Sequence, residues 1–140
     1  MIKSKQVTIL LVEDNKSDAR LIKEFISNTD LNSVLYAVND GIECMDFLYM
    51  YCEYDCPDIV ILGLNLPRMS SIEVLKKIKN DSDLKRISVI VLTTSDAQDD
   101  VEECYKNYDN CYFIKPADLI DFEIVMNSIE DYWFKNIKLL

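Results

Sequence analysis

Five short segments of the chain are dominated by branched and aromatic apolar residues, a composition typical of β-strands. Three of them are almost continuously apolar, as expected for strands of a parallel sheet that is covered on both faces. The five segments are 7–13, 33–38, 58–62, 87–92 and 110–114. Between them, most clearly in 16–28 and 71–80, apolar residues recur every three or four positions, as in amphipathic helices. The pattern predicts strand and helix in alternation, five times over.

Polar residues stand where these helices are expected to begin. Two serines are followed, three residues later, by glutamate or glutamine, which is the spacing of a capping box. The candidate caps are Asn15, Ser70, Ser95 and Asp118. Gly41, within "NDG", is predicted to lie in an ordinary turn. Short connections between strands and helices predict a right-handed, doubly wound α/β domain with a five-stranded parallel sheet.

Length and composition narrow the class of protein. The chain has 140 residues, which suits one domain. Its net charge of −10 repels nucleic-acid phosphates and anionic lipids, so neither nucleic acid nor membrane is a predicted partner. Neither a membrane-spanning run nor a signal-peptide pattern is visible, which predicts a cytoplasmic protein. Five cysteines without paired CxxC spacing, and no histidine, predict reduced thiols rather than a zinc site.

In a doubly wound sheet, ligands bind beyond the carboxyl ends of the strands. Few residues occupy those positions in this chain. They are Glu13, Asp14 and Asn15 after the first strand, 63–65 after the third, 93–95 after the fourth, and Lys115 and Pro116 after the fifth.

Two carboxylates, a hydroxyl and a Lys-Pro pair in this order resemble the receiver domain of two-component response regulators. The fragments "ILLVEDN", "LNLPR", "VIVLTTSDAQDDV" and "CYFIKP" carry the resemblance over essentially the whole chain. They are most similar to stand-alone receivers that partner phytochrome-type histidine kinases. The resemblance implies a (βα)5 flavodoxin-like fold and a single receiver domain over 1–140, without an output domain.

The resemblance also implies roles for individual residues. The acidic pair would hold Mg²⁺ together with a backbone carbonyl further along the chain. A hydroxyl and a lysine would contact a phosphoryl group. An aromatic residue would change position when the hydroxyl moves. These residues are Glu13, Asp14 and Asn65 for the metal, Thr93 and Lys115 for the phosphoryl group, and Tyr112 as the switch aromatic.

The phosphoacceptor aspartate of the family falls on Gly63, which has no side chain to form an aspartyl phosphate or to bind a metal. Mg²⁺ binding is therefore expected to be weak. The missing side chain is expected to reduce carboxylate repulsion and to leave room for water, or for Lys115 to pair with Asp14. The family's Asp-Gly pair falls on Ser70 and Ser71, but capping explains Ser70 better than a relocated phosphoacceptor does.

The resemblance, with this departure, predicts a non-enzymatic pseudo-receiver that acts through protein–protein contacts. A sensor histidine kinase or another signalling protein is the expected partner. Receivers commonly dimerise through the fourth helix, fifth strand and fifth helix, which predicts a homodimer here.

Three consecutive aromatics span about 200° of the last helix, so they cannot all be buried. They are Tyr132, Trp133 and Phe134.

The second helix has a similar surplus of large apolar residues, too many for one buried stripe: Phe47, Tyr49, Met50, Tyr51 and Tyr54.

Two other functions stay open. One is an ordinary phosphate-accepting regulator represented by a mutant at Gly63. The other, more distant, is a small flavodoxin-like enzyme or nucleotide-binding protein, which would need a glycine-rich phosphate loop; the chain has two separated glycines.

Overall fold

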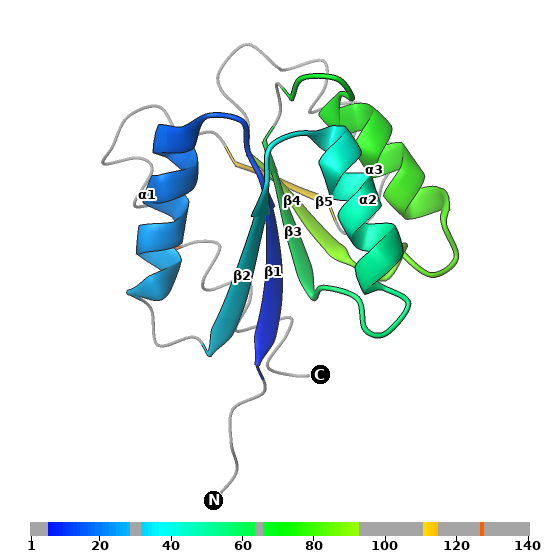
Figure 1. The fold of residues 1–140 in the computed structure, drawn as a ribbon, viewed down its shortest axis with the longest axis horizontal. Helices are drawn as coiled ribbons and strands as arrows, with labels where there is room; N and C mark the ends of the chain where they lie inside the picture. Colours follow the sequence, from blue (N-terminus) through cyan, green and yellow to red (C-terminus); the bar gives the residue numbers. More distant parts are fainter. Residues whose placement is uncertain (1–5, 29–31, 64–65, 93–110, 115–126, 128–140) are drawn as a thin grey trace, which may run out of the picture.

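A five-stranded parallel sheet with strand order β2-β1-β3-β4-β5 forms the centre of the computed structural model (Figure 1). The structure describes residues 6–28, 32–63, 66–92, 111–114 and 127. The strands are β1 Val7–Val12, β2 Ser33–Val38, β3 Ile59–Gly63, β4 Ser88–Leu92 and β5 Cys111–Ile114. Each strand bound lies within one residue of the sequence prediction. The predicted parallel α/β fold is confirmed.

Helices cover both faces of the sheet. Helix α1 (Lys16–Ser27) lies on one face, and α2 (Gly41–Tyr51) and α3 (Ser71–Asn80) lie on the other (Figure 1). Successive residues of a strand point to opposite faces, so Ile9 and Leu11 pack with the α1 layer, and Leu10 and Val12 pack with the α2 and α3 layer. This double coverage explains why the central strands are almost continuously apolar.

Side-chain caps set the starts of the helices. The Asn15 side chain accepts a hydrogen bond from the Asp18 N–H (3.0 Å), and the Ser70 hydroxyl accepts one from the Glu73 N–H (3.2 Å). Both predicted caps are confirmed. Ser95 and Asp118 lie outside the described residues.

Gly41 does not lie in an ordinary turn, as the sequence predicted, but is the first residue of α2. Asp40 caps that helix by accepting a hydrogen bond from the Glu43 N–H (2.9 Å). A Cβ added to Gly41 would lie 2.5 Å from the Met69 carbonyl oxygen. Glycine is therefore needed because the helix start and the segment before α3 approach each other closely.

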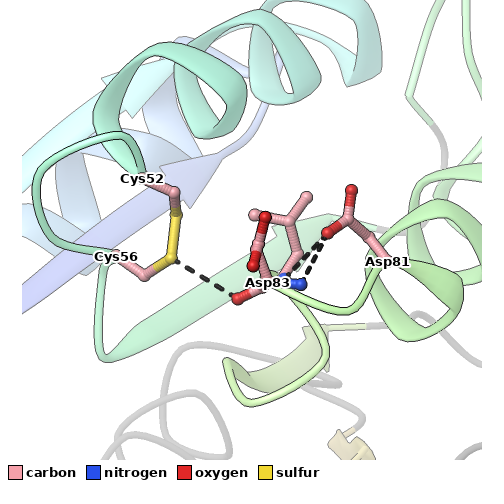
Figure 2. Close-up of a disulfide and its surroundings, with 5 residues drawn as sticks. Cys52, Cys56, Asp81 and Asp83 are labelled. Atoms are coloured by element: carbon pink, nitrogen blue, oxygen red, sulfur yellow. Dashed lines mark hydrogen bonds between the residues drawn. A yellow bond between two sulfur atoms is a disulfide. The ribbon is translucent and has the colours of Figure 1, made fainter.

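The prediction of reduced thiols is wrong for two of the cysteines. Cys52, which follows the last residue of α2, forms a disulfide with Cys56, and the bond closes the turn that leads toward β3 (Figure 2). The Cys56 sulfur lies 3.8 Å from the Asp83 carbonyl oxygen. Cys44 is a buried free thiol. Sequence spacing alone did not indicate the pair because residues four apart bridge only when the backbone turns back on itself.

Candidate functional site

The carboxyl ends of β1 and β3 lie side by side, which brings Glu13 next to Gly63. Val12 of β1 is in register with Leu62 of β3, and each is followed directly by one of these two residues. The Glu13 N–H donates to the Val38 carbonyl (3.2 Å), which extends the pairing of the chain with β2 by one residue. The structure therefore places Glu13 and Gly63 at the same edge of the sheet, as the sequence predicted for ligand-binding positions.

The Glu13 carboxylate occupies the space beside Gly63. A Cβ added to Gly63 would lie 2.5 Å from Glu13 Oε2 and 3.2 Å from Glu13 Cδ. The other carboxylate oxygen, Oε1, accepts a hydrogen bond from the Asn15 N–H (3.1 Å). From the sequence we expected the glycine to leave room for water, or for Lys115 to pair with Asp14. The Glu13 carboxylate lies in part of that room, and Lys115 is outside the described residues.

The surroundings of Glu13 change its acidity. Burial raises the pKa of Glu13 to about 7; the Asn15 N–H opposes this shift, and the negative charges of Asp18 and Asp14 add to it. Glu13 therefore holds its proton to a higher pH than an ordinary glutamate does. A neutral carboxyl group is a poor ligand for a divalent cation.

Ser71 stabilises the end of β3. Its hydroxyl donates a hydrogen bond to the carbonyl oxygen of Gly63, and the residue is buried at the start of α3. Ser70, its neighbour, caps the same helix. Both serines therefore have structural roles. The hydrogen bond of Ser71 to Gly63 was not predicted, because it joins residues that the sequence assigns to separate elements.

Asp40 and Arg68 form an ion pair at the same end of the sheet. The Asp40 side chain is buried, and Arg68 is exposed. Arg68 Nε donates to Asp40 Oδ2 (2.9 Å), and Arg68 Nη2 lies 2.8 Å from the same oxygen. The hydrogen bond from the Glu43 N–H, together with Arg68, lowers the pKa of Asp40. Sequence reasoning missed both residues; the spacing of Asp40 and Glu43, which matches a capping box, was the available signal.

The backbone of Arg68 is in the left-handed region, with φ of 65°. A non-glycine residue in this region is uncommon. The conformation turns the chain between β3 and α3, and the guanidinium reaches the start of α2. The ion pair thus ties the segment before α3 to α2.

Several predicted site residues cannot be placed. Asn65, Thr93, Lys115, and the aromatic residues Tyr132, Trp133 and Phe134 lie outside the described residues. Tyr112 lies on β5, in register with Ile90 of β4, and its side chain is outside the described part.

The metal site is brought together only in part. Glu13 and Asp14 are adjacent, but Glu13 is turned toward the space over Gly63. Within the part of the chain that the structure describes, no three His, Cys, Asp or Glu side chains lie close enough together to hold a metal ion. Two carboxylates are a loose fit to Mg²⁺, which binds through one or two carboxylates together with phosphate oxygens and water.

A family model described as "Response regulator receiver domain" matches residues 9–126. The chain belongs to this family. The receiver is 41% identical to response regulator Rcp1 of Synechocystis sp. over 134 residues, which cover 94% of this chain and 91% of that protein. It is 36% identical to the probable methanogenesis regulatory protein FilR2 of Methanothrix harundinacea, with 89% and 82% of the two chains covered.

Solved structures of response regulators have the same fold as this receiver. The phosphorylated cyanobacterial phytochrome response regulator RcpA superposes with a TM-score of 0.84 at 41% identity, covering 93% of this chain and 95% of that one. The Mn²⁺-bound form of response regulator Rcp1 superposes with a TM-score of 0.83 at 40% identity, covering 93% and 96%. The receiver is therefore a two-component signalling domain of the class that interacts with histidine kinases or other signalling proteins.

Among the described ranges, the receiver has no helix that is both long and apolar enough to cross a lipid bilayer.

Proposed function

We propose that this receiver lacks a phosphoacceptor and acts in two-component signalling through protein–protein contacts. The observation that carries the proposal is the end of β3. Gly63 stands there without a side chain, and the carboxylate of Glu13 lies where the side chain of another residue would begin.

The chemistry of phosphoryl transfer supports the same conclusion. An acceptor must present a nucleophilic oxygen, which glycine does not have. The two nearby serines do not replace it. The Ser71 hydroxyl is buried and donates to the Gly63 carbonyl, and the Ser70 hydroxyl caps α3. An acyl phosphate cannot form at position 63 because glycine has no carboxylate. Burial of Ser71 keeps its hydroxyl from reaching a phosphodonor.

A divalent cation would be held weakly in this receiver. Glu13, Asp14 and the backbone carbonyl of Asn65 are the proposed ligands, and a bound cation would neutralise the carboxylate pair. Thr93 and Lys115 are proposed remnants of a phosphate pocket, and Tyr112 is the proposed switch aromatic. The raised pKa of Glu13 supports weak binding at neutral pH, because a proton competes with the cation.

The partners follow from the family. We expect a sensor histidine kinase or another signalling protein, and a homodimer formed through the fourth helix, fifth strand and fifth helix, with Tyr132, Trp133 and Phe134 as candidate contacts. We expect the receiver to signal from the cytoplasm by occupying a partner rather than by acting on it.

Phosphorylation of a Gly63→Asp variant tests the proposal. The parent, the variant and a Gly63→Asn control are incubated with Mg²⁺ and acetyl phosphate, and their intact masses are measured. Glu13 Oε2 is the far end of a flexible side chain, so it can move aside for the new residue. We expect a labile phosphoryl group on Gly63→Asp alone, because the asparagine control has the same size but no carboxylate.

Two other results would change the interpretation. Phosphorylation of the parent overturns the proposal, and peptide mapping would then identify the modified residue. If neither the parent nor Gly63→Asp reacts, the pocket around position 63 has lost more than its acceptor. That second result would still mean that the receiver does not take part in phosphoryl transfer. It would favour a purely structural role for Glu13 and Asp14.

A further inference from the structure

Three aromatic rings pack together where α2 lies over the edge strand β2. The ring centroids of Tyr36 and Phe47 are 5.3 Å apart, those of Tyr36 and Tyr51 are 5.5 Å apart, and those of Phe47 and Tyr51 are 5.1 Å apart. The last pair is stacked, with an interplanar angle of 12°. Hydrogen bonding to the Tyr36 side chain raises the pKa of Tyr51. The rings form one ordered cluster rather than three independent side chains.

Exposed apolar side chains continue this cluster. Among the described residues, most of the exposed large hydrophobic side chains lie on β2, α2 or the turn after α2. Met50 is 72% exposed and Tyr54 is 90% exposed. Phe47, Met50 and Tyr51 lie three and four positions apart, which places them on one side of α2, and Tyr54 follows in the turn. We call this surface the aromatic face; it consists of Tyr36, Phe47, Met50, Tyr51 and Tyr54.

The aromatic face is surrounded by negative charge. The sequence contains no lysine or arginine between Asn32 and Pro67. It has six acidic residues in the same range: Asp40, Glu43, Asp46, Glu53, Asp55 and Asp58. Asp46, Glu53 and Asp55 are exposed on α2 or in the turn after it. Asp40 is paired with Arg68, so the negative potential over the aromatic face comes from the exposed carboxylates of Asp46, Glu53 and Asp55.

The turn that carries Tyr54 is held in place by covalent and hydrogen bonds. The disulfide joins Cys52 to Cys56 on either side of it (Figure 2). The N–H groups of Tyr54 and Asp55 both donate to the Tyr51 carbonyl, at 3.1 and 3.2 Å. An ordered surface loses less conformational entropy when a partner binds, so exposed side chains on such a turn are suited to recognition.

We propose that the aromatic face is a docking site for a partner protein segment that presents arginine side chains among apolar ones. A guanidinium group stacks on tyrosine rings and also pairs with carboxylates, so arginine matches both features of this surface. A second copy of this chain is a poor occupant of this face, since the same face of the copy lies in segment 32–67, which has no arginine and is acidic. Nucleic acid is excluded by the net charge of −10.

This site is separate from the end of β3 at Gly63. The aromatic face rests on β2, α2 and the following turn, whereas Glu13 and Gly63 lie at the ends of β1 and β3. Docking here therefore requires neither phosphorylation nor a metal ion. Failure of one proposal leaves the other intact, because the two tests use different residues and different readouts.

Titration with a pair of peptides tests the docking site. The probe is an amphipathic peptide of leucine and arginine, and its partner has glutamate in place of every arginine. Amide chemical shifts of the ¹⁵N-labelled full chain are followed during each titration. We expect shifts at Tyr36 and along 47–55 with the arginine peptide, and none with the glutamate peptide.

Three variants separate specific docking from general attraction. Tyr54→Ser removes a ring that is 90% exposed, so the fold should not change, and we expect the affinity for the arginine peptide to fall about two- to five-fold. Glu53→Lys should weaken binding by a similar factor. Glu24→Lys is the matched control: it makes the same change in net charge at an exposed position of α1, on the opposite face of the sheet (Figure 1), and removes only the exposed ion pair of Glu24 with Arg20.

The proposal would be overturned by any of three results. The arginine peptide causes no shift at millimolar concentration, or its shifts avoid the aromatic face, or Glu24→Lys weakens binding as much as Glu53→Lys does. The last result would mean that the peptide responds to net charge alone. Circular dichroism of each variant verifies that the fold is retained.

Discussion

The two glycines of this chain have different environments, and their replacement should have different consequences. A Cβ at Gly41 would lie 2.5 Å from the Met69 backbone carbonyl and 2.8 Å from Met69 Cβ. Neither atom can move without shifting the chain. A Cβ at Gly63 would lie 2.5 Å from Glu13 Oε2, the end of a side chain that can rotate away, and 3.2 Å from the Val12 carbonyl oxygen, which would need to shift by only a few tenths of an ångström.

We predict that Gly41→Ala lowers the free energy of unfolding by about 1–3 kcal/mol, because overpacking against backbone forces the elements apart. Gly63→Ala is the matched control. Its cost should be small, because moving Glu13 is offset by the about 0.5–1 kcal/mol that alanine gains over glycine in a strand. Urea denaturation of both variants measures the difference. Equal losses would mean that the approach of α2 to the segment before α3 is less tight than the structure shows.

Glu13 should make the stability of the receiver depend on pH. Its pKa in the folded protein is about 7, above the usual value of a glutamate, so the folded state binds more protons than the unfolded state between these two values. The free energy of unfolding therefore falls as pH rises from about 4.5 toward 7. Because Glu13 is partly exposed to solvent, we expect its contribution to be on the order of 1 kcal/mol.

Glu13→Gln should remove this component, since glutamine does not titrate. The measurement is urea denaturation at several pH values between 4.5 and 8 for the parent, Glu13→Gln and the exposed control Glu24→Gln. The slope should flatten for Glu13→Gln and stay unchanged for Glu24→Gln. A flattened slope in both variants would assign the effect to the net charge of the protein.

At the level of elements, the strands and most caps follow from local sequence. Strand bounds agree with the prediction to within one residue because branched apolar runs and polar breaks mark them. Asn15 and Ser70 cap their helices as predicted. The start of α2 was not predicted, because "NDG" is also a common turn sequence. The contact of Gly41 with Met69 decides between the two, and it joins residues far apart in the chain.

The disulfide at the end of α2 should stabilise the turn that it closes. The bond spans a sequence separation of 4, and closing so short a loop contributes up to about 2 kcal/mol. We predict that reduction lowers the free energy of unfolding by up to this amount. Urea denaturation with and without a phosphine reductant measures it. The double variant Cys52→Ser/Cys56→Ser should not respond to the reductant, and a response there would assign the effect to another cysteine.

For the whole molecule, the fold of the family depends on its apolar core. Among the described residues the core consists of two apolar layers, one on each face of the sheet, and neither includes Gly63. The side chain at position 63, at the rim of the sheet, therefore does not decide how these layers pack. The predicted homodimer stays a prediction, because its candidate contacts Tyr132, Trp133 and Phe134 lie outside the described residues.

The sequence by itself determined the strands, the alternation of strands and helices, and the set of residues expected at the carboxyl ends of the strands. These depend on periodicity and local caps, which neighbouring residues encode. Only the tertiary structure decided that the Glu13 carboxylate fills the space over Gly63, that Ser71 binds the Gly63 carbonyl, and that Cys52 pairs with Cys56. Each of these depends on how the backbone folds back in space, where distances of a few tenths of an ångström decide which atoms meet.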